Sequence, residues 1–231
     1  MKLCYHLTPA LALCLKILSA SLLGDTIDVR LLGVGKTDDA PNRYLKTDHA
    51  FQKLDFSTRQ PSEAIRAEAN RCLSLYKEVP EGGPAPSYQI AQELDLPEGA
   101  KHILLVALHA KNETHYRVIE DDFTKVTFKE YLFVNTTSRQ VFIRIGPDRK
   151  AFKIEAKASK TWTIDPGLGQ SLPVTIQADF DNKIKTVYST YWRIRENERS
   201  IIVLDEVESK VKVTKIGDRL KTAETAPQEG K

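Results

Sequence analysis

A glycine-rich segment, Gly33-Val34-Gly35-Lys36-Thr37, is the strongest candidate for chemistry because it has the form of the end of a phosphate-binding loop. Such a loop also needs a glycine at position 30, so that the backbone can curl and direct its amides at the phosphates. Arg30 stands there instead. Asp38, Asp39 and Pro41 lie where a helix N-terminus would hold the phosphates. We therefore exclude nucleotide binding.

The histidines do not form a recognisable catalytic or zinc motif. His102 and His109 are seven residues apart, which on a regular strand places them on opposite faces. His109 and His115 could approach each other across a predicted hairpin with Glu113 near its tip. The His-Glu-x-x-His spacing of zinc sites is absent from the sequence. We predict exposed hairpin histidines and no metal site.

Acidic clusters and nucleophiles give little support for an enzyme. Glu120-Asp121-Asp122 and Asp179-Phe180-Asp181-Asn182 contain oxygen ligands but lack the spacing and the turn glycine of a calcium loop. The sequence contains no Gly-x-Ser-x-Gly elbow and no Cys–His pair in a recognisable context. Paired carboxylates for glycoside hydrolysis stay open, because a sequence does not show their separation in space. We predict a non-enzyme without catalytic residues or cofactor.

Aromatic side chains provide the one hypothesis for a ligand-binding site. In Val187–Arg193, period-two alternation places Tyr188 and Trp192 on one side of a strand and Tyr191 on the other. Tyr188 and Trp192 are then expected to fill a core, where large aromatic residues contribute the most burial. Tyr191 and Trp162 are the candidate ligand-binding residues, as a platform on which sugar rings stack.

The first two dozen residues predict export. Met1-Lys2 supplies a positive start, Leu7–Leu18 is apolar, and Ser19-Ala20-Ser21 offers small residues for cleavage. The apolar run is too short for a transmembrane helix, which takes about 20 residues. We predict a signal peptide over residues 1–24. The mature chain is expected in the periplasm or outside the cell, with no membrane span.

Charge and cysteine content narrow the partners of the mature chain. Without Lys2 and Lys16, the 34 basic residues of the chain fall to 32 against 31 acidic residues, a net charge of +1. A surface with evenly mixed positive and negative charges lacks the basic stripe of nucleic-acid-binding proteins, so we predict no nucleic-acid partner.

Cys72 is the only cysteine outside the signal peptide. It is predicted to be a small buried hydrophobic residue.

After the signal peptide the pattern is almost wholly β. Short alternating or apolar segments separated by turn residues predict an all-β, immunoglobulin-like antiparallel β-sandwich. The apolar run Ile103–Leu108 suits a central strand buried on both faces. One short helix is predicted over Gln60–Ala69, with Pro61 in its first turn. Residues 36–50 are predicted to form a loop.

A break rich in Gly and Pro at residues 81–86 suggests two domains. We predict a small N-terminal β-rich domain over 25–86, a C-terminal β-sandwich over 87–216 and a disordered tail over 217–231. A single continuous sandwich is the alternative. No internal repeat is visible in the sequence, and Asn112 and Asn135 begin glycosylation sequons.

The C-terminal half contains several short segments that carry a family resemblance. They are Tyr131-Leu132-Phe133-Val134-Asn135-Thr136-Thr137, Val141–Ile145, Trp162-Thr163-Ile164-Asp165-Pro166-Gly167, Tyr188-Ser189-x-x-Trp192 and Arg199–Val203. With these segments, residues 100–216 resemble an uncharacterised family of small exported bacterial β-sandwich proteins. The resemblance implies a sandwich fold and an envelope setting, and it brings no catalytic residues.

These observations favour a non-catalytic exported protein that serves as a protein-interaction or structural module. A sandwich face or an edge strand would bind a protein of the envelope or the extracellular space. The alternative is a carbohydrate-binding module in which Tyr191 and Trp162 stack on a polysaccharide. A hydrolase whose carboxylates cannot be paired from the sequence is a third hypothesis.

Overall fold

The described part of the chain is built entirely from strands, turns and irregular segments. The computed structural model describes residues 25–35, 41–80, 86–110, 113–126, 129–146, 150–164, 169–195 and 198–219. Within these ranges there are sixteen strands in four sheets and no helix. Accordingly, no helix among these residues could cross a membrane. The all-β sandwich prediction is confirmed, whereas the predicted signal peptide over 1–24 lies outside the described residues.

Strands β1 to β8 form two sheets that enclose one core. Sheet A has the order β4 (Ile65–Ala69), β1 (Asp25–Gly35), β7 (His102–Ala110) and β8 (Glu113–Glu120). Sheet B has the order β3 (Phe51–Lys53), β2 (Tyr44–Lys46), β5 (Cys72–Val79) and β6 (Ser87–Asp95). The core between them includes Leu31, Leu75 and Leu105. Together these sheets form the N-terminal sandwich.

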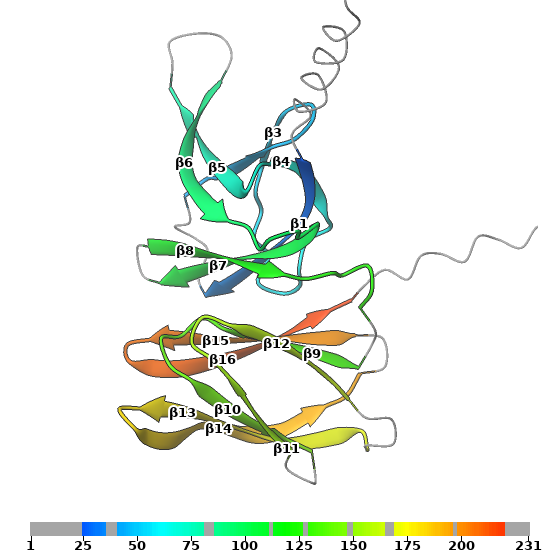
Figure 1. Ribbon diagram of the computed structural model, residues 1–231, viewed down its shortest axis with the longest axis vertical. Helices are drawn as coiled ribbons and strands as arrows, with labels where there is room; N and C mark the ends of the chain where they lie inside the picture. The colour runs from blue at the N-terminus through cyan, green and yellow to red at the C-terminus, as the bar shows by residue number, and fades with distance from the viewer. Residues whose placement is uncertain are drawn as a thin grey trace, which may run out of the picture.

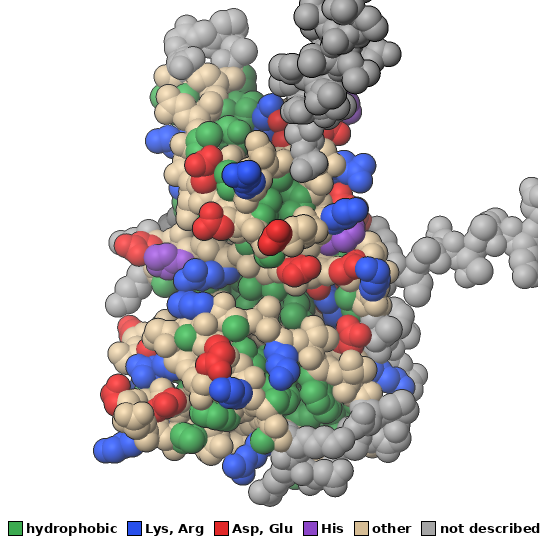
Figure 2. Space-filling model, in the orientation of Figure 1, with side chains coloured by type: hydrophobic (Ala, Val, Ile, Leu, Met, Phe, Trp, Pro, Cys, Tyr) green, Lys and Arg blue, Asp and Glu red, His purple; other side chains and the backbone are tan. Residues whose placement is uncertain are grey.

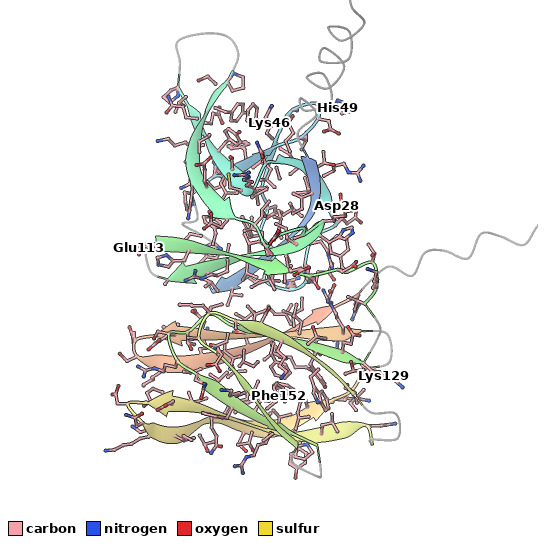
Figure 3. The ribbon with its side chains drawn as sticks, in the orientation of Figure 1. Asp28, Lys46, His49, Glu113, Lys129 and Phe152 are labelled. Atoms are coloured by element: carbon pink, nitrogen blue, oxygen red, sulfur yellow. The ribbon has the colours of Figure 1, made fainter. Side chains whose placement is uncertain are left out.

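Strands β9 to β16 form the C-terminal sandwich in the same way. Sheet C has the order β12 (Ser159–Thr163), β9 (Glu130–Asn135), β15 (Arg199–Val207) and β16 (Lys210–Asp218). Sheet D has the order β11 (Lys150–Ile154), β10 (Val141–Ile145), β13 (Ser171–Phe180) and β14 (Lys183–Arg193). Its core includes Phe133, Ile143 and Trp192, and Phe152 packs against it (Figure 3).

The four sheets are stacked as layers in the order B, A, C, D (Figure 1). Sheets A and C join through an apolar cluster that contains Leu104 and Val106 of β7 and Ile201 and Val203 of β15. The residues of β7 between these positions belong to the N-terminal core. The prediction that Ile103–Leu108 is a central strand buried on both faces is therefore confirmed. Because both faces of sheets A and C are covered, the two sandwiches form one continuous apolar body.

The two sandwiches share one topology, with β1–β8 matching β9–β16 strand for strand. In both, the first strand pairs in parallel with the seventh, and the other pairs are antiparallel. The sixth strand of each carries a bulge at the equivalent place, at Ala91 in β6 and Val187 in β14. The hairpins β7–β8 and β15–β16 match residue for residue, so that Asp121 is equivalent to Asp218. This structural repeat is hidden in the sequence because the matched strands share few residue types.

The helix predicted over Gln60–Ala69 is wrong, because Ile65–Ala69 forms strand β4 at the edge of sheet A. Alternate residues Ala67 and Ala69 of this strand are buried in the N-terminal core. Alanine and glutamate favour a helix only weakly. Pairing with β1 supplies the backbone with partners and overrides that preference.

Three predicted boundaries also differ from the structure. Strands β5 and β6, on either side of residues 81–86, are adjacent in sheet B, so the sandwiches divide between β8 and β9. The short strand β2 lies inside the predicted loop 36–50. Strand β16 continues to Asp218, two residues into the predicted tail, and residues 220–231 lie outside the described residues. Long-range pairing determines each of these boundaries, and local composition does not encode it.

Gly33 and Gly35 have a structural role within β1. A Cβ atom at Gly33 would lie 2.8 Å from the carbonyl oxygen of Phe56. Gly35 has a φ of +96°, and a Cβ atom there would lie 2.5 Å from the carbonyl oxygen of His109. Both glycines therefore allow close approach of β1 to neighbouring backbone. Lys36 and Thr37, which complete the glycine-rich motif, lie outside the described residues.

Candidate interaction surface

The longest sheet edge in the described structure is strand β14, which spans Lys183–Arg193 at one side of sheet D. It follows β13 through a tight turn in which Asp181 and Asn182 have φ values of 54° and 65°. Positive φ at both central residues is typical of a type I′ hairpin turn. An edge strand presents a row of unpaired N–H and C=O groups to a further strand. We therefore treat β14 as the candidate interaction surface.

The backbone hydrogen bonds show which residues of β14 face its free edge. The N–H of Ile194 donates to the carbonyl oxygen of Gln170 at 2.9 Å, just past the end of the β13–β14 ladder. Hydrogen-bonded and non-hydrogen-bonded pairs alternate along an antiparallel ladder. Tyr191 and Ser189 therefore turn their N–H groups away from β13. Pro173, which has no N–H, is accordingly opposite Tyr191.

Large hydrophobic side chains are exposed on two edge strands. On β14, the exposed fraction is 56% for Ile184 and 73% for Tyr191. On β6, the equivalent strand of the N-terminal sandwich, it is 53% for Ile90. Apolar side chains beside unpaired backbone groups are the features that strand addition uses, since the backbone supplies affinity and the side chains supply specificity.

The structure places Tyr191 and Trp162 apart. Tyr191 points outward from sheet D, because its neighbour Trp192 is buried in the C-terminal core. Trp162 belongs to β12 of sheet C and packs against that core, with its ring stacked on Tyr131 at a centroid distance of 6.0 Å. Tyr188 also packs against the core, as predicted, and accepts a hydrogen bond from Trp192 Nε1 at 3.2 Å. Tyr191 and Trp162 therefore do not form one stacking platform.

Four charged side chains form a buried chain of ion pairs where the sandwiches meet. Arg199 donates two hydrogen bonds to the Asp121 carboxylate, at 2.7 and 2.6 Å, and a third from Nε to Asp218 at 2.7 Å. Arg30 donates to both oxygens of Asp218, at 2.9 and 2.6 Å. Each of the four residues is at most 6% exposed. We call this set the buried ion-pair chain.

The buried ion-pair chain links the two sandwiches in a defined geometry. Arg30 and Asp121 come from the N-terminal sandwich and the segment after it, whereas Arg199 and Asp218 come from β15 and β16. Burial acts to raise the pKa of Asp218, but the two guanidinium groups outweigh burial and hold this pKa below its ordinary value. Bidentate pairs add geometric specificity to their energy. The buried ion-pair chain therefore fixes the position of the two sandwiches, and hence of β6 and β14, relative to each other.

Asp121 lies in the acidic cluster Glu120-Asp121-Asp122, whose oxygens could in principle bind calcium. Its carboxylate instead binds Arg199, from a strand far along the sequence. No local signal marks this pairing, because 78 residues separate the partners. The one usable signal is Arg199 beside the apolar run Ile201–Leu204, because a charge at the start of a buried strand needs a partner.

The side chains of the histidines of sheet A do not converge. His109 pairs with Thr114 and His115 pairs with Leu108, so His109 and His115 lie on opposite faces of the hairpin. His102 Nδ1 lies 3.5 Å from the Asp28 carboxylate, and His115 Nε2 lies 3.3 Å from that of Glu113. Asp28 and Glu113 mark opposite ends of sheet A in Figure 3. Burial lowers the pKa of His109. Throughout the ranges that the structure describes, no three His, Cys, Asp or Glu side chains are placed to hold a metal ion.

Cys72 is half-buried on β5, so the prediction of a fully buried hydrophobic residue is wrong. Its thiol lies 3.6 Å from a carboxylate oxygen of Glu93. Burial, followed by the charge of Glu93, raises the pKa of the Cys72 thiol. A thiol that stays protonated is a weak nucleophile, so this environment does not activate Cys72.

The sequon at Asn135 is buried in the fold. Asn135 is 1% exposed, and its Nδ2 donates to the carbonyl oxygens of Arg139 and Glu155, both at 2.8 Å. Its Oδ1 accepts a hydrogen bond from Thr137 Oγ1 at 2.8 Å. The side chain therefore shapes the turn after β9 and cannot carry a glycan in the folded protein. Asn112 lies outside the described residues.

A hollow of about 1000 Å³ lies at one end of the N-terminal sandwich. Its charged lining includes Asp28, Arg66, Arg71, Lys101 and His102. Arg66 Nε lies 3.4 Å from the Asp28 carboxylate, so part of this charge is already paired. The mixture of signs favours no single ligand class.

No protein-family model and no curated protein matches this sequence. The choice among functions therefore rests on the geometry and charge of the surface.

Proposed function

We propose that this chain is a non-catalytic exported protein of the envelope or the extracellular space, whose β14 edge binds a protein partner by strand addition. The observation that carries the proposal is the exposure of β14, with Ile184 and Tyr191 projecting from a long edge. A partner strand would pair with the outward N–H groups of Ser189 and Tyr191. Such main-chain pairing supplies the affinity of strand addition.

Sheet D supports a binding role for β14 because the sheet would not need to rearrange when a partner strand pairs with this edge. Sheet D rests on the C-terminal core, which contains Ile176 and Val174 of β13, the strand paired with β14. A preorganised edge loses little conformational entropy when a strand docks. The side chains that flank the edge then select the partner.

The substitution Ser189→Pro tests strand addition. Ser189 is exposed and its N–H faces the free edge, which is the position where an edge strand tolerates proline. We expect the variant to fold but to lose capture of the partner from solubilised envelope of its own organism, read by mass spectrometry. Ser189→Ala, which keeps the N–H, is the matched control and should retain capture. Equal capture by all three proteins would refute the proposal.

Export is tested separately with the full chain in its own host. Cell fractionation should place the protein outside the cytoplasm, and the intact mass should show cleavage between Ala20 and Gly24. If the protein were instead uncleaved and confined to the cytoplasm, the proposed location in the envelope or outside the cell would be refuted.

Carbohydrate binding is a second candidate because the ring of Tyr191 is the most exposed large hydrophobic side chain described. Aromatic rings on flat sheet faces can stack on sugars. Tyr191→Ala would then abolish retention on polysaccharide without altering the circular dichroism spectrum. Unchanged retention, or no retention of the parent protein, would eliminate this candidate.

A further inference from the structure

The equivalent edge strands of the two sandwiches carry opposite charge. Strand β14 contains Lys183, Lys185 and Arg193 and no acidic residue. Its counterpart β6 contains Glu93 and Asp95 and no basic residue. All five side chains are exposed. The two equivalent edge strands therefore have the same backbone arrangement but opposite net charge.

The neighbouring edge strands extend this difference. β16, which lies beside β14, carries two exposed lysines, Lys210 and Lys212, and the half-buried Lys215. Its one acidic residue, Asp218, is buried in the ion-pair chain. β8, which lies beside β6, carries two glutamates and one arginine, Glu113, Glu120 and Arg117. Figure 2 shows acidic side chains gathered on the N-terminal sandwich at the level of β7 and β8.

The backbone of β6 is also oriented for strand addition. The N–H of Leu96 donates to the carbonyl oxygen of Arg71 at 3.1 Å. Alternation along the β5–β6 ladder then turns the N–H groups of Glu93 and Asp95 toward the free edge. Counting from the matched bulges, Glu93 occupies the position that Ser189 occupies in β14. Each edge thus has the same outward pattern of donors.

We infer that the partner strand of β14 is β6 of a second copy of this chain, an inference that rests on the proposed function. The acidic β6/β8 edge of one copy meets the basic β14/β16 edge of the next, which brings Ile90 toward an edge that exposes Ile184. Pairing two β14 edges would bring basic residues only toward basic residues, and like charges directly opposite across strands are destabilising. The contact is therefore between unlike edges.

Two unlike edges on one molecule allow each copy to contact two others. β6 and β14 belong to sheets B and D, the two outermost layers of the stack (Figure 1). The two edge strands of one molecule therefore cannot pair with each other. A contact between different surfaces that does not close generates a filament. The assembly should also weaken in salt, since the screening length falls from about 10 Å at 0.1 M to about 3 Å at 1 M ionic strength.

Sedimentation velocity of the processed protein tests the inference. We expect the wild type to grow beyond a dimer as concentration rises in low salt, and to shrink in 1 M NaCl. Ser189→Pro blocks the basic edge and Glu93→Pro blocks the acidic edge, so each variant alone should be monomeric. Their equimolar mixture should form a heterodimer and nothing larger, because one open edge of each sign remains.

Charge reversal supplies a test that misfolding cannot imitate. Glu93→Lys with Asp95→Lys makes strands β6 and β14 both net basic, and Lys183→Glu with Lys185→Glu makes these two strands both net acidic. Each double variant should be monomeric, and mixing the two should restore association.

A wild type that stays monomeric at every concentration overturns the inference. If Ser189→Pro still abolishes capture of another protein, the proposed function stands without self-association. Loss of neither property in Ser189→Pro would refute both.

Discussion

Replacing Arg199 with methionine should be among the most damaging single changes in this protein. Arg199 is 2% exposed and donates three hydrogen bonds to two aspartates from opposite sandwiches. Methionine retains much of the volume of the apolar part of the arginine side chain. The change in stability therefore reports the loss of the charge. Asp121 then loses its arginine partner inside an apolar body, whereas Asp218 keeps Arg30.

The expected magnitude follows from that uncompensated charge. Breaking a buried ion pair by removing one partner reduces the free energy of unfolding by about 3–5 kcal/mol. For a chain of 150–250 residues, each kcal/mol shifts the melting temperature by about 2–4 °C. Arg199→Met should therefore lower the melting temperature by about 6–20 °C. For a stability of about 10 kcal/mol, the middle of the usual range, the variant stays folded at room temperature.

Urea denaturation followed by tryptophan fluorescence measures this effect. The matched control is Lys125→Met, which removes a surface cation paired with Asp122 and whose side chain is 83% exposed. We expect no measurable change for the control. A loss below about 1 kcal/mol for Arg199→Met, as is typical of surface pairs, would refute the structural role of the buried ion-pair chain.

Four further outcomes follow from particular contacts. The pKa of Asp218 is lowered in the fold, so its contribution to stability, present at neutral pH, should fade as pH drops below about 4 in acid titrations followed by circular dichroism. Burial raises the pKa of Tyr131 to about 12, so alkaline titration should show stability falling above the unfolded value of about 10. Gly33→Ala should destabilise the fold by about 1–3 kcal/mol in urea, because its Cβ would meet the Phe56 carbonyl; a gain in stability would contradict this contact. Asn135→Ala should lower stability by about 1–3 kcal/mol, and peptide mass spectrometry of the parent protein should find no glycan at Asn135.

Local patterns predicted most strands because burial follows the two-residue period of a strand. Trp192 and Tyr188 pack against the C-terminal core while Tyr191 faces out, as their alternation indicates. The pattern failed at β4, where Ala67 and Glu68 suit a helix but the chain pairs with β1. Local preference is worth tenths of a kcal/mol per residue, and sheet pairing exceeds it.

Taken alone, the sequence determined the all-β class, the central strand Ile103–Leu108 and the outward position of Tyr191, because each depends on neighbours along the chain. Only the tertiary structure decided that the sandwiches divide after β8, that they repeat one topology, and that Arg199 joins Asp121 to Asp218. It also decided that Trp162 packs inward, apart from Tyr191. Partners brought together across 78 or 188 residues leave no local periodicity, since their proximity follows from sheet pairing and layer stacking.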